Sequence, residues 1–330
     1  MIVIRTPLRI SLGGGGTDLP FYADKFGASL ITAAINKYVY ITISPTIQKD
    51  IKLNYSQTEH AEHVTKVKHP LIREALIHTN NLTNIEIHSS SDVLSGTGLG
   101  SSSSFLVGLL NGLNYYNGNR VSKYKLAEDS SHIIMDVLKE PAGKQDQYAA
   151  AFGGLSHLRI NTNGKVIVTP INISQENVDM LEKNLMLFYT GFTRSANDIL
   201  GEQKKKAEQN ETEIFNYYHE IKKIGEASLK CLEKGDLRRF GEWMNIHWEL
   251  KRKITNNMSN SKIDEWYALA LANGAIGGKV IGAGGGGFLL FYVEKNHDKV
   301  KQILETDGLV HIPFKFEFEG SRIVYDGKHF

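Results

Sequence analysis

The sequence contains a single cysteine, Cys231, among its 330 residues. One cysteine can form neither an internal disulfide nor a cysteine-based zinc site, which is typical of proteins in the reducing cytoplasm. Long apolar runs are also missing, since runs such as residues 105–110 are far shorter than the ~20 residues of a membrane-spanning helix. The apolar start at residues 1–4 is too brief for a signal peptide. We therefore expect a cytoplasmic protein with no membrane partner.

An excess of charge of one sign is missing as well, since 38 Lys and Arg residues face 36 Asp and Glu residues, for a net charge of +2. The composition therefore forces no wide basic surface, and we expect no nucleic-acid partner. Hydrophobic residues make up 41% and charged residues 22%, as in a folded globular protein. A length of 330 residues suggests two domains with sizeable cores.

Glycine, by contrast, is concentrated in three clusters, at residues 13–16, 96–100 and 282–287. The second cluster follows an alternating strand pattern at residues 85–88 and leads through four serines into an apolar helical run. A strand that leads through glycines into a helix builds an anion site, because backbone N–H groups at the helix start can face a phosphate. The glycine spacing matches neither the Walker A loop nor the dinucleotide fingerprint. A surface loop rich in glycine and serine is the alternative interpretation.

Hydrophobic periodicity predicts an α+β protein with a domain boundary near residues 171–177. Asn163–Gly164 is typical of a hairpin turn, so residues 155–169 should form two strands. Further strands are expected at residues 2–12 (bent at Pro7), 28–44, 51–55 and 185–189, and on both sides of the third glycine cluster, between 279 and 293. Helices are expected at residues 69–79, 122–138, 197–208, 212–233, 237–254, 262–273 and 298–305.

Asp146 is the strongest candidate for a group that drives chemistry. It follows Pro141 and Gly143 and is flanked by amides and a lysine rather than by other carboxylates. A carboxylate near a cation stays ionised and can orient a hydroxyl or accept its proton. The alternative, that Asp146 caps a helix over residues 147–151, is equally compatible with the sequence.

Three segments resemble, in order, the motifs of GHMP kinases, the family of galactokinase, homoserine kinase, mevalonate kinase and phosphomevalonate kinase. Residues 6–18 resemble the first motif, residues 98–102 match the G-L-G-S-S phosphate loop, and residues 281–287 resemble the glycine-rich third motif. The resemblance implies a two-domain α+β fold, with residues 1–173 and 174–330 as the domains and the active site in the cleft between them. It also implies ATP and Mg²⁺ as cofactors and a small-molecule sugar phosphate as substrate.

Within the family, residues 5–11 with the four glycines after them, 143–147 and 190–194 resemble sugar 1-kinases that act on D-glycero-D-manno-heptose 7-phosphate. This resemblance implies phosphorylation of an anomeric hydroxyl, which feeds nucleotide-activated heptose into bacterial surface polysaccharides. Fucokinase-like enzymes share much of the pattern and are an alternative. A non-catalytic sugar and nucleotide sensor is a further alternative, although a binder has no need of Asp146, Arg9 and Ser102 together. A homodimer is compatible with the sequence.

By the same resemblance, Asp146 is the catalytic aspartate and Arg9 is the cation that keeps it ionised. Asp18 is the ligand of a sugar hydroxyl, and Ser102 supplies a hydroxyl that contacts Mg²⁺. The substrate's own phosphate is assigned to Arg194, whose alternative role is an ion pair or cap at the next helix. The expected nucleotide-binding residues are Gly96, Gly98, Leu99, Gly100, Ser101, Ser102 and Ser103. The expected substrate-binding residues are Gly14, Gly15, Gly16, Thr17, Asp18, Lys144, Arg194, Gly284 and Gly285.

Two positions depart from the family pattern. Gly15–Gly16 stand where many relatives carry a glutamate and a histidine, and Ile134 stands near the position of a magnesium-binding glutamate. Asp136 or Glu140 could replace that glutamate, and Asp136 is the expected metal ligand beside Ser102. Alternatively, phosphates, Ser102 and water could hold the ion, an arrangement that Mg²⁺ readily accepts.

Overall fold

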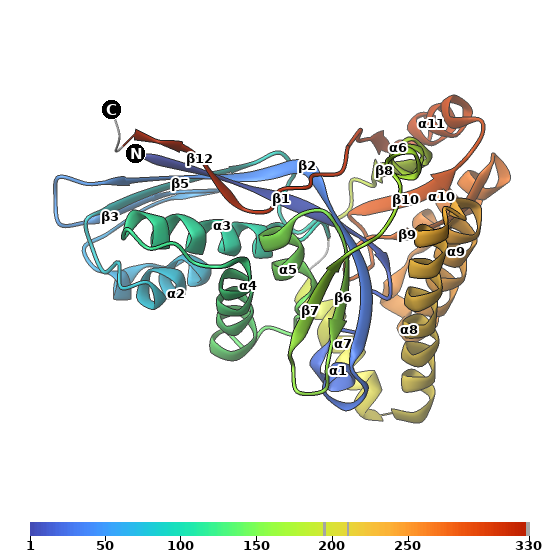
Figure 1. The fold of residues 1–330 in the computed structure, drawn as a ribbon, viewed down its shortest axis with the longest axis horizontal. Coiled ribbons are helices and arrows are strands. Elements are labelled where there is room, and N and C mark those ends of the chain that lie inside the picture. The colour runs from blue at the N-terminus through green and yellow to red at the C-terminus, as the bar shows by residue number, and fades with distance from the viewer. Residues whose placement is uncertain (194–195, 210, 328–330) are drawn as a thin grey trace.

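The computed structural model describes residues 1–193, 196–209 and 211–327, and these residues form two β-sheets flanked by helices (Figure 1). In these ranges the larger sheet has eight strands in the order β12-β1-β2-β5-β3-β4, with β6 beside β2 and β7 beside β6. Its strands are β1 (Ile2–Gly13), β2 (Ala28–Pro45), β3 (Ile51–Asn54), β4 (Thr58–Ala61), β5 (Ile85–Ser91), β6 (Leu155–Ile160), β7 (Val166–Pro170) and β12 (Arg322–Asp326). The smaller sheet has the order β11-β8-β10-β9, from β8 (Leu185–Tyr189), β9 (Ala275–Val280), β10 (Phe288–Val293) and β11 (Val310–His311). The predicted α+β class is confirmed.

The long strand β2 organises the larger sheet. It pairs with β1 along most of its length, with β6 through residues 28–33 and with β5 through residues 39–45. The register of β1 against β2 shifts between Pro7 and Leu8, which is where the sequence predicts a bend. A proline has no N–H to donate to the ladder, so an irregularity in the pairing is expected at this point.

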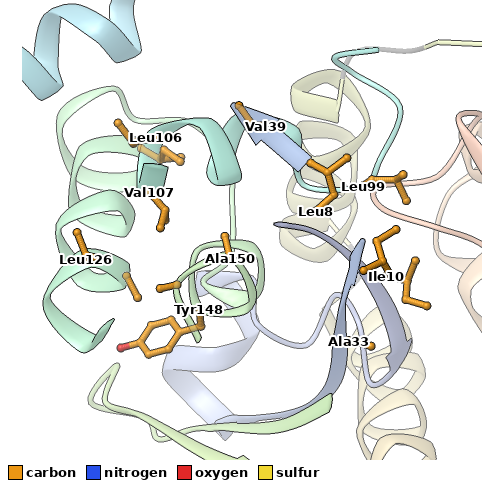
Figure 2. Close-up of a cluster of buried hydrophobic side chains, with 14 of the residues drawn as sticks. Leu8, Ile10, Ala33, Val39, Leu99, Leu106, Val107, Leu126, Tyr148 and Ala150 are labelled. Carbon is orange, nitrogen blue, oxygen red and sulfur yellow. The ribbon is translucent and has the colours of Figure 1, made fainter. Parts of the chain in front are cut away.

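Helix α3 (Ser101–Tyr116) packs directly against β1 and β2. A Cβ atom added at Gly112 would lie 2.5 Å from Ile4 Cδ1, so glycine allows the helix to approach the sheet closely. Leu106 and Val107 of this helix belong to the buried apolar cluster drawn in Figure 2, together with side chains of β1, β2 and the neighbouring helices. This packing fixes the start of α3, and with it the phosphate loop, relative to β1.

The other helices of the first half are α1 (Pro20–Phe26), α2 (Pro70–His78), α4 (Lys123–His132) and α5 (Gln145–Phe152), with a 3₁₀ turn, η1 (Val64–Lys66). The helix predicted at residues 122–138 is α-helical only as far as His132 and continues as a π-helix, η2 (Ile133–Val137). The predicted helix and the structure therefore agree in extent but differ in the type of its last turn. Such π segments are common near functional sites.

The second half consists of helices against the smaller sheet: α6 (Gln175–Asn184), α7 (Ala196–Gln209), α8 (Glu211–Lys234), α9 (Leu237–Ile254), α10 (Ser261–Ala272), α11 (His297–Thr306) and a 3₁₀ turn, η3 (Asn256–Met258). Helix α9 approaches β9 so closely that a Cβ atom added at Gly277 would lie 2.1 Å from the carbonyl oxygen of Gly241. This contact fixes α9 and β9 relative to each other, and with them the side chains that both elements contribute to the same region. Among the described residues, no helix is both long enough and apolar enough to span a bilayer.

Several contacts join the halves of the chain, among them those of α8 and α9 with β1 and of α8 with β2. Helix α1 packs against α8 through aromatic rings, with Tyr22 and Phe26 each edge-on to Phe215 and the Tyr22 hydroxyl 2.8 Å from His219 Nδ1. At the other end, β12 returns to pair with β1, so the first and last strands lie side by side (Figure 1). The division of the chain at residue 173 stays a prediction.

Candidate active site

A cavity of about 200 Å³ lies where the three glycine clusters meet. Residues of all three clusters line it, together with the starts of α3 and α5 and with side chains of α9 and β9. The phosphate loop and the third loop touch, since a Cβ atom added at Gly282 would lie 2.6 Å from the Cα atom of Gly98. The glycines therefore share one explanation: they let backbone loops pack against one another around a single site.

The phosphate loop leads into α3 as the sequence predicts. Gly98 and Gly100 have φ angles of +87° and +76°, and Gly100 is the N-cap residue of the helix without a side-chain cap. The N–H groups of residues 101–103 at the helix start are therefore available to a ligand, and these serines line the cavity. An N-terminus of this kind suits phosphate oxygens. Gly96 also lines the cavity, whereas the Leu99 side chain is buried behind the loop.

Arg9 and Asp146 form a bidentate ion pair at the floor of this loop. Arg9 Nε donates to Asp146 Oδ1 at 2.7 Å, and Nη2 donates to Oδ2 at 2.6 Å. Arg9 Nη1 donates to the carbonyl oxygen of Gly98 at 2.5 Å, so the same guanidinium also holds the phosphate loop. Asp146 lies in the first turn of α5 and is not its N-cap residue, so the capping alternative does not describe this helix. The Asp146 side chain is 26% exposed and that of Arg9 only 6%, so the carboxylate is the partner that faces the cavity.

Asp18 is the second carboxylate of the cavity. Its Oδ2 accepts a hydrogen bond of 3.0 Å from the backbone N–H of Gln145. Burial raises the pKa of Asp18 above its ordinary value, and the nearby Asp146 carboxylate acts in the same direction, while the Gln145 N–H opposes them. A Cβ atom at Gly143 would lie 2.0 Å from Asp18 Oδ2, so glycine is required there to leave this carboxylate its place.

In the four-glycine loop, residues 13–18, some residues line the cavity and others pack against the rest of the protein. Gly15 and Gly16 line the cavity. Gly14 instead packs on the backbone of Ser29, where a Cβ atom would lie 1.9 Å from the carbonyl oxygen, and Thr17 Oγ1 donates to the Gly14 carbonyl oxygen at 2.8 Å. Gly14 and Thr17 therefore shape the loop and do not face the cavity.

In the glycine-rich third loop, residues 281–287, some residues also line the cavity while others pack behind it. Gly284 and Gly286 line the cavity. The Gly285 N–H donates to the carbonyl oxygen of Met258 at 2.8 Å, which ties the loop to η3. Of the two predicted substrate contacts in this loop, the structure thus brings Gly284 to the cavity and places Gly285 behind it.

Comparison with known proteins agrees with this geometry. Residues 62–154 match the GHMP kinases N terminal domain, and residues 228–306 match the GHMP kinases C terminal domain. A D-glycero-alpha-D-manno-heptose 7-phosphate kinase of Campylobacter jejuni is 31% identical in an alignment of 330 residues that covers 96% of each protein. The chain belongs to the GHMP kinase family. The predicted family and the GHMP kinase fold are confirmed.

Other GHMP kinases and solved structures are similar to this chain. The crystal structure of a D-glycero-D-manno-heptose 1-phosphate kinase from Bacteroides thetaiotaomicron superposes with a TM-score of 0.81 at 26% identity, over 99% of this chain and 100% of that one. A putative sugar kinase from Campylobacter jejuni gives a TM-score of 0.77 at 27% identity, over 98% and 97%. The mevalonate kinase of Pyrococcus horikoshii is 24% identical over 76% of this chain and 72% of its own length.

Two further residues predicted for the GHMP kinase site, Lys144 and Asp136, do not reach the cavity. Lys144 Nζ is engaged by both carboxylate oxygens of Glu128, at 3.0 and 2.8 Å, and by the carbonyl oxygen of Gly164 at 3.0 Å, in a separate surface depression. Asp136 is 65% exposed and pairs with His132 one helical turn away, at 2.9 Å. An alternating or helical pattern does not show which way such side chains turn. Arg194 lies outside the described residues.

The side chains that line the cavity limit which residues could hold Mg²⁺. Ile134 and Glu140 both line it, whereas Asp136 does not. The described residues contain no group of three or more His, Cys, Asp and Glu side chains that could hold a metal ion on its own. Ser102 and Glu140 both offer side-chain oxygen atoms at the cavity wall, and Mg²⁺ is commonly held by one or two protein oxygens with phosphates and water. The residues present therefore fit this ion when it arrives with a nucleotide.

Sequence reasoning missed two lysines of the cavity wall. Lys251 of α9 and Lys279 of β9 line the cavity and are only 7% and 2% exposed. Burial, with the nearby Arg9 guanidinium, lowers the pKa of Lys251 to about 8. Burial and the Lys251 ammonium also hold the pKa of Lys279 well below its usual range. The available signal was weak: Lys279 interrupts an apolar strand directly before the third motif.

Proposed function

We propose that the protein is an ATP-dependent kinase that transfers the γ-phosphoryl group to the anomeric hydroxyl of D-glycero-D-manno-heptose 7-phosphate, forming the 1,7-bisphosphate. The product would supply nucleotide-activated heptose for surface polysaccharide. The observation that carries the proposal is the Arg9–Asp146 pair beneath the phosphate loop, in a chain similar over its length to a heptose 7-phosphate kinase. A sensor of sugar and nucleotide needs no carboxylate that an arginine holds beside a phosphate loop.

The nucleotide phosphates would lie at the N-terminus of α3, on the free N–H groups and hydroxyls of residues 101–103. A Cβ atom at Gly100 would lie 3.3 Å from Asp146 Oδ2, so the phosphate loop runs directly past the proposed base. Mg²⁺, held by Ser102 and Glu140 with phosphate oxygens, would supply neutralisation of the developing charge.

The sugar would lie between Asp18 and Asp146. The anomeric oxygen attacks the γ-phosphorus, the bond from that phosphorus to the bridging oxygen of ADP breaks, and the hydroxyl proton passes to a carboxylate oxygen of Asp146. Each of these oxygens keeps a lone pair beyond the one that accepts from Arg9. Arg9 holds the carboxylate in place through two hydrogen bonds, while Asp18 would bind a second hydroxyl of the sugar.

Release of ADP over a panel of free and phosphorylated sugars tests the proposal. We expect the highest kcat/KM with D-glycero-D-manno-heptose 7-phosphate and little activity with fucose, galactose or mevalonate. A preference for fucose would favour the fucokinase-like alternative. Release of ADP that no sugar stimulates would contradict the proposal. The cytoplasmic location and assembly as a homodimer stay predictions.

A further inference from the structure

Lys251 and Lys279 place two amino groups in the wall of the cavity, and the Asp18 carboxylate is close enough to Lys251 to favour its charged form. Lys251 Nζ donates to the carbonyl oxygen of Gly282 at 2.6 Å. Lys279 Nζ lies 3.5 Å from Nδ1 of His247, whose pKa is held well below its usual range by burial and by the two lysines. Within the described ranges, no Asp or Glu oxygen lies within ion-pair distance of either ammonium. Buried cations in such surroundings are costly to the folded state.

Hydrogen-bond donors without acceptors gather beside the lysines. Ser11 Oγ and Gln145 Nε2 are buried, line the cavity and have no hydrogen-bond partner in the described part of the chain. A Cβ atom at Gly15 would lie 2.6 Å from Ser11 Oγ and 3.8 Å from Gln145 Oε1, so both side chains meet at this glycine. The ring of His247 also faces the backbone of Gly15. Cations and unused donors on one wall are the surroundings that an anion requires.

The position of this wall separates it from the phosphate loop. Lys251 lies at its near end, because it binds Gly282, which touches Gly98 of the phosphate loop. His247 precedes Lys251 by four residues of α9, about 6 Å along the helix axis. The His247–Lys279 pair therefore marks the far end of the wall, beside the sugar loop at Gly15. An anion on this side of the cavity would belong to the acceptor and not to the nucleotide.

We propose that Lys251 and Lys279, with Ser11 and Gln145, form a subsite for the phosphate that the acceptor sugar already carries. This inference rests on the proposed function and adds the residues that select a phosphorylated sugar. A phosphate dianion would favour the ammonium forms of both lysines and would accept hydrogen bonds from the two unpartnered donors. Gly15 keeps the way to Ser11 open, since any side chain at Gly15 would lie against that hydroxyl. A sugar without a phosphate would leave both lysines without an anion at ion-pair distance, so the subsite would favour a phosphorylated sugar.

Steady-state kinetics of Lys279→Met tests the subsite, because methionine fills a similar volume without charge. At saturating ATP, we expect KM for heptose 7-phosphate to rise ~10- to 100-fold, the loss of one hydrogen bond between charged groups. KM for ATP should stay within about 2-fold of the wild-type value. The preference for heptose 7-phosphate over unphosphorylated heptose should fall by the same factor by which KM for heptose 7-phosphate rises. Lys125→Met, an exposed lysine on α4 paired with Asp129, is the matched control and should change none of these values.

A second variant separates loss of the subsite from loss of the fold. Ser11→Ala removes one hydroxyl that has no protein partner, so it should leave the thermal midpoint unchanged and still raise KM for the sugar phosphate severalfold. If Lys279→Met instead raises KM for ATP alone, the lysines serve the nucleotide and the subsite assignment is wrong. If both variants keep the full preference for phosphorylated heptose, the subsite is wrong although the proposed function stands. If the wild-type protein prefers an unphosphorylated sugar, the proposed function fails and this inference fails with it.

Discussion

Replacement of Asp146 by Asn is the most informative perturbation of the proposed mechanism. The amide keeps the size of the side chain but cannot accept the hydroxyl proton, and its NH₂ group would face an Arg9 donor at what is now a 2.6–2.7 Å contact. General-base groups contribute ~10²–10⁴ in rate. We therefore expect kcat to fall by this factor, equivalent to about 3–5 kcal/mol of transition-state stabilisation. In the proposed arrangement Asp146 contacts the sugar and not the nucleotide, so ATP binding should change little.

Arg9→Met, alone and combined with Asp146→Asn, gives a double-mutant cycle that tests whether the two residues act as one unit. The variant removes both hydrogen bonds to Asp146 and the bond to the Gly98 carbonyl oxygen, so it should lower kcat and also raise KM for ATP. Residues that act as one unit are not additive. The Arg9→Met, Asp146→Asn double variant should therefore lose much less than the product of the two single losses.

A coupled ADP-release assay gives kcat, and displacement of a fluorescent ATP analogue gives nucleotide affinity. Asp179→Asn, an exposed carboxylate on α6, is the matched control and should behave as the wild type. Near-normal turnover in Asp146→Asn would refute the role of this carboxylate. Full additivity in the double variant would refute the claim that Arg9 acts through Asp146.

Four further predictions concern the loops and the buried charge. Gly98→Val should raise KM for ATP strongly and lower stability, because its Cβ would lie 2.5 Å from a carbonyl oxygen at a φ angle of +87°; nucleotide titration and thermal unfolding check both effects. Ser102→Ala should raise the Mg²⁺ concentration needed for half-maximal activity more than it changes KM for the sugar, which a magnesium titration measures. Gly143→Ala should raise KM for the sugar at least ~10-fold with KM for ATP unchanged, because its Cβ would displace the Asp18 carboxylate by clashing at 2.0 Å. The pKa of Lys251 is about 8 in the folded protein, below its ordinary value of 10.5, so between these values the unfolded chain binds one proton more than the folded chain. The free energy of unfolding should therefore increase with pH in this range. From pH 7.5 to 9.5, urea unfolding should show an increase of about 1–2 kcal/mol that is absent in Lys251→Met.

Local patterns in the sequence predict the parts of the site that are held by local geometry. The run from Gly96 to Ser104 predicts a loop that enters a helix, because tight turns and helix starts depend on residues close in the chain. The Asn163–Gly164 turn predicts its hairpin for the same reason. Asp146 was singled out by its neighbours, and the structure then shows Arg9, which is 137 positions away, bound to it. The family motifs supplied that long-range pairing; the spacing alone could not.

The remaining features depend on tertiary contacts. Lys251 and Lys279 are ordinary residues of a helix and a strand until the close contact of α9 with β9 turns both toward the cavity. Lys144 sits two residues from Asp146, yet the start of α5 directs it to Glu128 instead. The return of β12 to pair with β1 is likewise decided by the sheet edge and not by any pattern within residues 322–326. Patterns within a single sequence do not show which way these side chains turn or which strand β12 pairs with.

Phosphorus NMR of the reaction product tests the central claim most directly. With ATP, Mg²⁺ and D-glycero-D-manno-heptose 7-phosphate, we expect one new phosphate resonance coupled to the anomeric proton, while the original phosphate ester remains and one ADP forms per new resonance. A new phosphate on another carbon, or formation of inorganic phosphate without a new sugar ester, would contradict the account.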